Sequence, residues 1–336
     1  MNKSCLIGFL MCSAFSLVVQ AATDGAHITK TISQIERKKG IKRTIQYRPD
    51  GNDFVCVNGK NRYTRALYGG ITDFRIETSD RPVFAAYKPK DSKHICFRLQ
   101  CGNQSIALDS LKFCEARYRA GRRTYRLTDP LLGKGELNIS VLAFPDAEGG
   151  IWRFTMKDMP EGALLHCYIS EIRAKNLSRN GDMGADRADS FDAPQLPKEQ
   201  KHYKLSLDGT TAYIVVEDQE LRLPALVEGT SLYDKSEKWR SEIESSLQIS
   251  TPDPYFNPLG GALAAAADGI WDGKIWLHGA IGWRSQLNGW RAAYIGDFIG
   301  WHDRARTHFD SYAASQVTDV PATIPHPTQD TALHLA

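Results

Sequence analysis

The feature that most constrains the fold is an alternation of apolar and polar side chains that runs from about Phe54 to Val216. In "FCEARYR", Cys114, Ala116 and Tyr118 fall on one side, and the residues between them are charged. Successive side chains of a β-strand point to opposite faces, so this period of two predicts strands with one buried face. Further runs of this kind, separated by Pro and Gly turns, are "ELNISVLAF", "GIWRFTM" and "ALLHCYISEI".

These strand-like runs are short and numerous, and no helical pattern interrupts them. Such a sequence is typical of a large antiparallel β-sandwich. Ala120-Gly121 predicts a tight turn between two of the runs. In "HYKLSLDGTTAYIVV", the dipeptide Asp208-Gly209 is flanked by β-branched and aromatic residues, which predicts a β-hairpin.

The period changes from two to that of a helix near Ser236. A stripe of Trp239, Ile243 and Leu247 predicts a linker helix over residues 236–250. The alanine-rich stretch that follows predicts a buried helix closed near Gly269, and a third helix is expected from about Trp301 to Val317. The apolar stripe of the alanine-rich helix comprises Leu259, Leu263, Ala266 and Ile270. We therefore expect a β-sandwich domain at 22–235, the linker helix, and a helical domain at 251–336.

Composition and the N-terminus narrow the class of protein. Apolar residues make up 42% of the 336 residues, enough for a packed core, and a net charge of +3 is too small to indicate nucleic-acid binding. The short apolar run from Cys5 to Val19, followed by Val19-Gln20-Ala21, predicts a secretory signal peptide at residues 1–21 rather than a membrane-spanning helix. We therefore expect a periplasmic or secreted protein without a transmembrane segment.

Five cysteines remain after the predicted cleavage, and none forms a CxxC motif. This count argues against a zinc site and favours buried thiols on strands, with one disulfide left possible. The loop "NGDMGADRADSFDAP" contains several carboxylates that could bind calcium, but their spacing differs from that of an EF-hand and a solvated loop at a domain edge is the favoured interpretation. These candidate ligands are Asp182, Asp186, Asp189 and Asp192. No other metal and no cofactor is expected.

The stretch "IWLHGAIGWRSQLNGWRAAYIGDFIGWHDRARTHFD" contains four of the seven tryptophans, three of them in repeats of a Gly-Trp phrase. Flat indole faces match the apolar faces of sugar rings, while Arg, Asp, Asn and His side chains pair with hydroxyl groups. An oligosaccharide or polysaccharide is therefore the expected partner. The candidate contacts are Trp283, Arg284, Trp290, Arg291, Asp297, Trp301, His302 and Asp303.

Two of these residues are also weak catalytic candidates. Glycoside cleavage needs a pair of carboxyl groups, and Asp297 or Asp303 could supply one of them. The alternative is structural: the tryptophans pack a core, the arginines form local ion pairs, and His302 caps a helix.

Three strings resemble an exported family of gut Bacteroidetes that carries the domain of unknown function numbered 4450. They are "VNGKNRYTRALYGGITDFRIETSDRPVFAAY", "RNGDMGADRADSFDA" and the helical "GGALAAAADGIWDGKIWLHGAIGWR" with its continuation. The helical part resembles the opening of a six-hairpin (α/α)6 toroid glycosidase. This resemblance implies a β-sandwich followed by a helical toroid, an α-L-rhamnosidase-like architecture, and an exported protein that takes part in polysaccharide degradation.

Such proteins normally continue for several hundred residues, whereas this chain ends at Ala336. The resemblance therefore implies an incomplete toroid, with the main catalytic acid and base beyond Ala336. A glycoside hydrolase is the leading expectation. A non-catalytic carbohydrate-binding or surface-assembly protein is the alternative, and a polysaccharide lyase with a Tyr/His base pair acting on uronic acids is a third.

Overall fold

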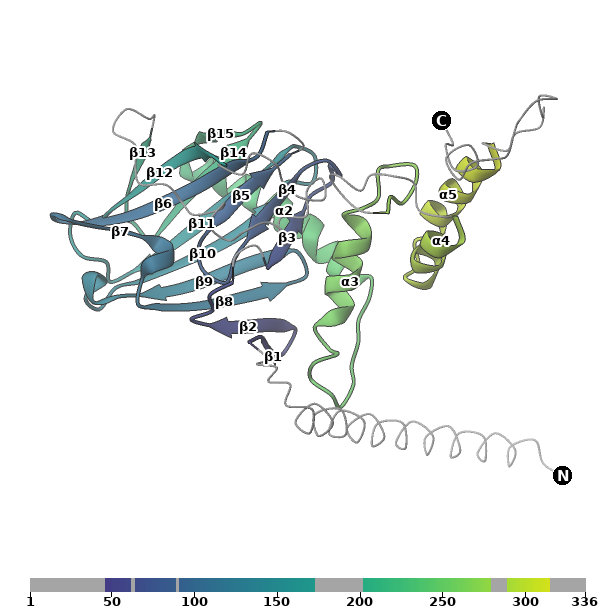
Figure 1. Cartoon of the computed structure of the whole chain (residues 1–336), viewed down its shortest axis with the longest axis horizontal. Helices are drawn as coiled ribbons and strands as arrows, with labels where there is room; N and C mark the ends of the chain where they lie inside the picture. Colours follow the sequence, from purple (N-terminus) through teal and green to yellow (C-terminus); the bar gives the residue numbers. More distant parts are fainter. Residues whose placement is uncertain (1–45, 62–63, 89–90, 173–201, 279–288, 315–336) are drawn as a thin grey trace.

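The computed structural model describes residues 46–61, 64–88, 91–172, 202–278 and 289–314. Within these residues the chain forms two facing antiparallel sheets, a helix that packs on the first of them, and further helices beyond the sandwich (Figure 1). The predicted signal peptide at 1–21, the candidate calcium loop and the pair Trp283-Arg284 lie outside the described residues. None of the described helices is long and apolar enough to cross a membrane.

The first sheet of the described chain has eight strands in the order β1-β2-β8-β9-β10-β11-β14-β15. Their bounds are β1 Arg48–Asp50, β2 Asp53–Val57, β8 Phe113–Arg119, β9 Arg122–Thr128, β10 Glu136–Ala143, β11 Gly149–Lys157, β14 Thr211–Glu217 and β15 Glu220–Arg222.

The second sheet, again counted over the described residues, has seven strands. Six follow the order β13-β12-β6-β5-β4-β3, and β7 pairs with β6. Their bounds are β3 Arg65–Tyr68, β4 Arg75–Thr78, β5 Phe84–Tyr87, β6 Lys93–Cys101, β7 Gln104–Ala107, β12 Leu164–Glu171 and β13 Tyr203–Ser206; two short 3-10 turns, at Leu108–Ser110 and Pro130–Leu132, complete the sandwich.

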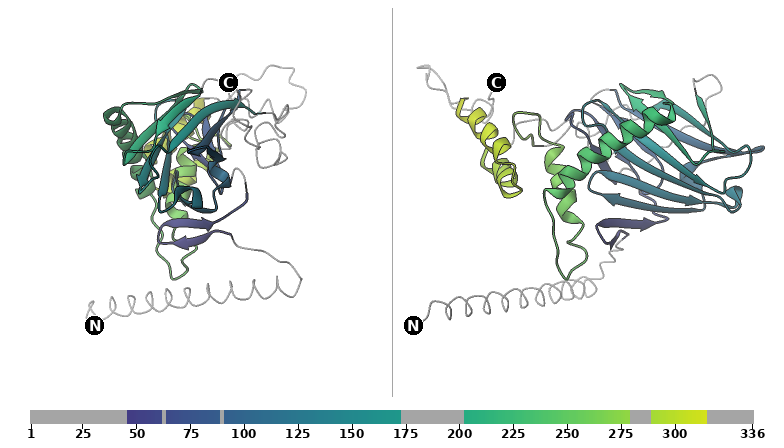
Figure 2. Two further views of the ribbon diagram at one scale, coloured as in Figure 1. Left: turned by 90° about the vertical axis from the view of Figure 1, so that its left-hand side faces the viewer. Right: turned by 180° about the vertical axis from the view of Figure 1, so that it is seen from behind.

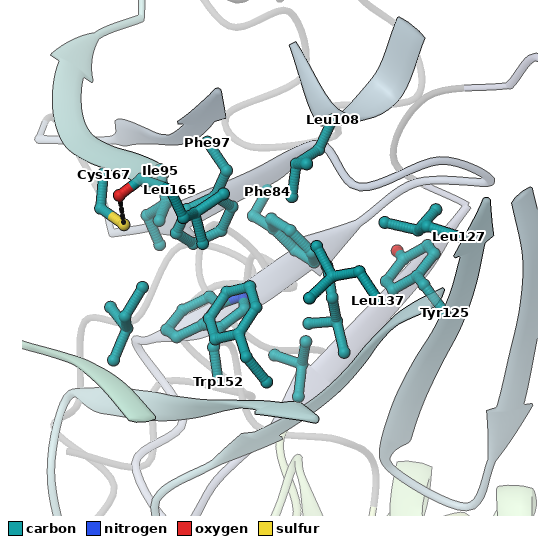
Figure 3. Packing of buried hydrophobic residues seen from close by; sticks show 14 of the residues in the cluster. Phe84, Ile95, Phe97, Leu108, Tyr125, Leu127, Leu137, Trp152, Leu165 and Cys167 are labelled. Atoms are coloured by element: carbon teal, nitrogen blue, oxygen red, sulfur yellow. Dashed lines mark hydrogen bonds between the residues drawn. The ribbon is translucent and has the colours of Figure 1, made fainter. Parts of the chain in front are cut away.

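The core lies between the two sheets and confirms the alternation seen in the sequence. Cys114, Ala116 and Tyr118 of β8 are buried, and the charged residues between them lie on the outer face. Aromatic rings from both sheets meet at Phe84, whose ring centroid lies 5.6 Å from those of Tyr125 and Trp152 in edge-to-face contacts (Figure 3). This geometry is favourable for aromatic pairs and joins the sheets through large buried side chains.

The expected hairpin at Asp208-Gly209 is wrong. β13 pairs with β12 in the second sheet, whereas β14 pairs with β11 in the first. The dipeptide therefore lies where the chain crosses between sheets. Leu207 is fully buried at this crossing, and its N–H donates to the carbonyl of Ala163. The turn residues permitted a hairpin, but long-range pairing of each strand decided the outcome.

Helix α2 (Leu226–Ser245) packs across the outer face of the first sheet, against β10, β11 and β14 (Figure 2, right). It begins at Leu226 rather than at the expected Ser236, inside the stretch assigned to the sandwich. Its buried residues are Gly229, Tyr233, Ser236, Arg240 and Ile243. Of the three residues expected on the buried face, Ile243 is buried, whereas Trp239 and Leu247 are only half-buried. A Cβ on Gly229 would lie 2.4 Å from the ring of Tyr213, so glycine permits the close approach.

Helix α3 (Leu259–Asp268) ends at Gly269 as expected, but its expected apolar stripe is wrong. Leu263 is 54% exposed, and the buried face instead contains Gly260, Ala264 and Ala267. The small residues let the helix approach its neighbours closely; a Cβ on Gly260 would lie 2.6 Å from the carbonyl oxygen of Leu247. The small size of these side chains, rather than their hydrophobicity, therefore decides which face of α3 is buried.

Two further helices, α4 (Gly289–Phe298) and α5 (His302–Ala314), pack against each other beyond α3 (Figure 1). Residues 315–317 of the expected third helix lie outside the described residues. The Gly-Trp phrase lies at the start of two helices. Gly289 is the first residue of α4, and Gly300, with φ of 85°, lies just before α5. The described helices do not amount to a toroid, so that part of the fold remains a prediction.

Candidate functional site

The described part of the tryptophan-rich stretch folds around Trp276, which is a core residue. Trp276 is 1% exposed, and its indole N–H donates to the carbonyl of Ala267 at 3.0 Å. Its backbone N–H donates to Nδ1 of the fully buried His308 at 3.0 Å. Trp276 therefore joins the end of α3 to α5 and is unavailable to a ligand.

Next to this core lies a half-exposed group of side chains, here called the aromatic–arginine cluster, which consists of Asp268, Trp271, Trp301 and Arg304. The Arg304 guanidinium lies over the ring of Trp301 at 4.4 Å and over that of Trp271 at 5.7 Å. Nη1 of Arg304 donates to Oδ1 of Asp268 at 2.7 Å. A planar cation is thus held between two indoles by one carboxylate.

Asp268 is the buried member of the cluster. Its side chain is 7% exposed, whereas that of Arg304 is 32% exposed. Burial raises the pKa of Asp268 above its ordinary value of 3.8, although the hydrogen bond and charge of Arg304 act in the opposite direction. Because Nη1 of Arg304 donates to its carboxylate, Asp268 orients Arg304 rather than facing solvent itself. The partly exposed members of the cluster are Trp271, Trp301 and Arg304, and indoles with a guanidinium suit a ligand that combines apolar and hydroxyl surfaces.

The structure brings only some of the expected site residues together. Trp301 belongs to the aromatic–arginine cluster. Nδ1 of His302 lies 2.6 Å from Oδ1 of Asp297, with both side chains more than two-thirds exposed. Asp303 is exposed in the first turn of α5. The pair His302–Asp297 therefore joins the end of α4 to the start of α5 at the surface.

The remaining expected residues are placed less fully. Trp290 and Arg291 lie in the first turn of α4, where only the backbone is described, and Trp283 and Arg284 lie outside the described residues. The described residues contain no group of three or more His, Cys, Asp or Glu side chains that could hold a metal ion.

The sequence reasoning missed Asp268 and Arg304. One signal was present: Asp268 is the single charged residue of the otherwise apolar helix "LGGALAAAAD". A buried carboxylate without a partner is costly, so an acid in such a helix predicts a cationic partner nearby. The identity of that partner depends on how α5 packs, which the spacing of the two residues does not reveal.

The five cysteines lie on strands as expected, and all are free thiols. Four are buried and Cys101 is half-buried. Burial raises the pKa of Cys96 to about 12, against the lowering effect of a hydrogen bond with Tyr168, so this thiol stays protonated and unreactive at neutral pH.

Two pockets open on the sandwich. The outer-face pocket, of about 280 Å³, lies on the outer face of the first sheet over β8–β11. The sheet-edge pocket, of about 230 Å³, is bordered by β6, β12, β13 and β15. Among the residues lining the sheet-edge pocket are Lys93, Tyr168, Glu171 and Tyr203. Lys93 is occupied there, because its Nζ lies 2.6 Å from Oε1 of Glu171 and 2.8 Å from Oδ1 of Asp91.

A comparison with known protein families gives one match, and no curated protein matches the chain. The match runs from the loop before β6 to β14, so it covers strands of both sheets, including β8–β11 beneath the outer-face pocket. It ends before α2 and contains neither the aromatic–arginine cluster nor any residue of α3–α5. Residues 89–216 are a domain of the family described as Domain of unknown function (DUF4450).

Proposed function

We propose that this protein is an exported glycoside hydrolase of the six-hairpin type, to which this chain contributes the β-sandwich and the first helices. The observation that carries the proposal is the aromatic–arginine cluster, in which Trp271 and Trp301 flank a guanidinium held by the buried Asp268. The resemblance of the helical segment to the opening of a glycosidase toroid supports the same activity. Export to the periplasm or beyond is part of the proposal and rests on the N-terminal sequence.

The cluster suits a sugar for physical reasons. A pyranose ring has apolar C–H faces that stack on indoles, and its hydroxyl groups accept hydrogen bonds from a fixed guanidinium. Because the salt bridge to Asp268 and the stacking on Trp301 hold Arg304 in place, little side-chain entropy is lost on binding. The cluster accounts for sugar contact; it does not supply the pair of carboxyl groups that glycoside cleavage requires.

The test is a screen of the natural full-length gene product on aryl glycosides, α-L-rhamnosides included, and on pectic fragments. Release of a free monosaccharide is the expected result. Trp301→Ala should weaken oligosaccharide binding at least tenfold, Trp301→Phe should restore most of it, and Asp268→Asn should weaken it by releasing Arg304. Phe298→Ala is the matched control, because Phe298 is an aromatic residue of α4 that is 80% exposed outside the cluster.

Thermal unfolding of each variant separates binding from packing. Equal binding by wild type and Trp301→Ala, with a lower melting temperature, would make Trp301 a packing residue and remove the support for the proposal. An unsaturated product that absorbs in the ultraviolet would show a lyase instead. The described chain does contain a neighbouring His/Tyr pair, His308 and Tyr312 with ring centroids 4.9 Å apart, but His308 is fully buried and bonded to the backbone of Trp276.

A second candidate function is carbohydrate binding without catalysis, through the sandwich. The observation that favours it is that both pockets described above lie on the sheets. In that case the full-length protein would bind oligosaccharides without releasing any sugar, and variants of the aromatic–arginine cluster would bind as the wild type does.

A further inference from the structure

The outer-face pocket is built from four neighbouring strands whose outward side chains are nearly all polar. Cross-strand partners place these side chains in adjacent rows, with Arg117 opposite Thr124 and Asn138 opposite Thr155. The residues that line the pocket are Glu115, Arg117, Thr124, Tyr125, Arg126, Asn138, Ile139, Ser140, Arg153 and Thr155. Its volume of about 280 Å³ is at the lower end of the range of roughly 300–1,000 Å³ that is usual for small-molecule sites.

Two of the three arginines in the lining are neutralised by carboxylates. Arg117 contacts Glu115 at 2.8 Å and also Asp50 at 2.8 Å. Arg126 lies 3.5 Å from Glu115 and 3.4 Å from Glu136. The hydrogen bond from Arg117, against the opposing effect of burial, holds the pKa of Glu115 below its ordinary value of 4.5, so this carboxylate remains charged and paired.

The third arginine, Arg153, makes no ion pair with a carboxylate among the described residues. Its guanidinium instead lies over the ring of Tyr233 from α2, at 4.0 Å from the ring centroid. Tyr233 is itself fixed, because its hydroxyl is 2.7 Å from Oγ of Ser140, the cross-strand partner of Arg153. A guanidinium that stacks by its face keeps its N–H groups free in the plane, which is the geometry that binds a carboxylate in two places.

Besides these charged residues the pocket offers neutral hydrogen-bonding groups. Thr124, Asn138, Ser140 and Thr155 line it with hydroxyl and amide groups. Such groups pair with the hydroxyls of a polyol, while apolar anions would leave them unpaired. Because Arg117 and Arg126 are paired with carboxylates, Arg153 is the cation of the lining that is left for an anionic group.

We propose that the outer-face pocket binds the carboxylate-bearing ring of a uronic acid, with Arg153 as the carboxylate contact and the threonine and asparagine side chains as hydroxyl contacts. This site lies on the sandwich, outside the aromatic–arginine cluster, and it does not depend on the glycosidase proposal. It gives the DUF4450 domain a ligand class of its own: acidic sugars.

The test is a calorimetric titration of the full chain with oligogalacturonate and with the same oligosaccharide after methyl esterification. Free galacturonate, glucuronate and mannuronate are titrated in parallel by NMR. The expected result is that at least one acidic sugar binds at least tenfold more tightly than its neutral counterpart, and that added salt weakens this binding. Acetate and lactate serve as simple carboxylates and should bind far more weakly.

Three variants assign the contact to Arg153. Arg153→Gln should reduce the binding of the acidic sugar at least tenfold. Thr155→Glu, an exposed position, should reduce it similarly by placing a negative charge in the pocket without touching Tyr233. Lys157→Gln is the matched control, because Lys157 is an exposed cation on the same strand outside the pocket lining, and it should leave binding unchanged.

Thermal unfolding identifies any variant that fails to fold. If Arg153→Gln destabilises the packing of α2, Thr155→Glu still tests the pocket, because it leaves the contact between Arg153 and Tyr233 in place. The proposal is overturned if no uronate binds, if the methyl ester or acetate binds as tightly as the free acid, or if Lys157→Gln weakens binding as much as Thr155→Glu. Failure of the glycosidase screen leaves these outcomes unaffected, because none of them measures hydrolysis.

Discussion

Arg123 is a charged residue that lies in the apolar core. The alternation in "RRTYRLT" places it on the inner face of β9, between the sheets, and its side chain is fully buried. Nη2 donates to the hydroxyl of Tyr47 and to the carbonyl of Ser79, both at 2.8 Å, and lies 3.9 Å from Oδ1 of the fully buried Asp80. The cation thus ties the N-terminal segment to both sheets.

Replacing Arg123 by Met should strongly destabilise the fold. The change leaves the Asp80 carboxylate buried without its cation, and breaking such a pair typically costs about 3–5 kcal/mol. Urea denaturation measures the free energy of unfolding. Arg126→Met on the same strand, whose side chain is 42% exposed, is the control and should cost no more than about 1 kcal/mol. A loss equal to that of the control would show that the hydrogen bonds from Asn61 and Thr64 are enough to stabilise the buried Asp80 carboxylate.

At the scale of the element, α2 is attached to the sheet by ion pairs as well as by apolar contacts. Oε1 of Glu244 accepts from Nε of Arg119 on β8 at 2.6 Å, and Oε2 accepts from Nη1 of Arg240 at 2.8 Å. Burial by itself would raise the pKa of Glu244, but the hydrogen bonds from these two arginines outweigh it and lower the pKa from its ordinary value of 4.5. The folded state therefore favours the ionised carboxylate.

This shift predicts how stability depends on pH. A carboxyl group with a lowered folded-state pKa binds fewer protons when folded, so its contribution is complete above about pH 5.5 and is lost progressively as the pH falls below 4.5 and through the lowered folded-state pKa. Glu244→Gln should be less stable than wild type at pH 7, by about 1–3 kcal/mol, the range for hydrogen bonds to charged groups. The difference should shrink as the pH falls to 3.

Urea denaturation of both proteins from pH 7 to pH 3 checks this prediction. Glu242→Gln, an exposed position in the same helix, should show a small difference that does not vary with pH. A constant difference for Glu244→Gln would mean that its role is packing rather than charge.

At the scale of the whole molecule, α2 completes the sandwich and α3–α5 extend from it (Figure 2). Beneath α2, the outer face of the sheet is apolar at β10, β11 and β14, in contrast to the polar pocket beside it. Tyr233 of α2 packs there against Leu142, Phe144, Ile151, Tyr213 and Val215 of the sandwich. Without the helix, most of these side chains would face water.

A fragment of residues 46–250 should therefore fold cooperatively, whereas residues 46–224, which lack α2, should be unstable and bind a hydrophobic dye. The reason is the exposure of the cluster under α2, since buried apolar area contributes about 25 cal/mol per Å². Thermal unfolding and dye fluorescence of both fragments provide the measurement. Equal melting temperatures would show that the sheets are stable without the helix.

Sequence alone was sufficient wherever the signal was local. The alternation in β8 identified the buried face, because the period of a strand is a property of the backbone. Gly269 marked the end of α3 in the same way. The same local reasoning failed for Leu263, since hydrophobicity alone cannot tell that small residues will form the contact face of a close-packed helix.

The candidate sites show the same division. Composition indicated the aromatic, cationic and acidic groups of the helical segment, but Trp276 became core and Trp301 joined Arg304 and Asp268 only through the packing of α5 on α3. Arg153 drew no attention in the sequence. It became a candidate ligand contact only because Tyr233, far along the chain, stacks on it.

By itself, the sequence predicted the strand alternation and its buried face, as in β8, and the end of α3 at Gly269, because these depend on spacings of a few residues. The tertiary structure alone decided that Asp208-Gly209 joins the two sheets, and which cations find carboxylates. These outcomes depend on pairs of residues distant in the chain, such as Arg304 with Asp268, and contact between such residues is settled by the packing of whole elements.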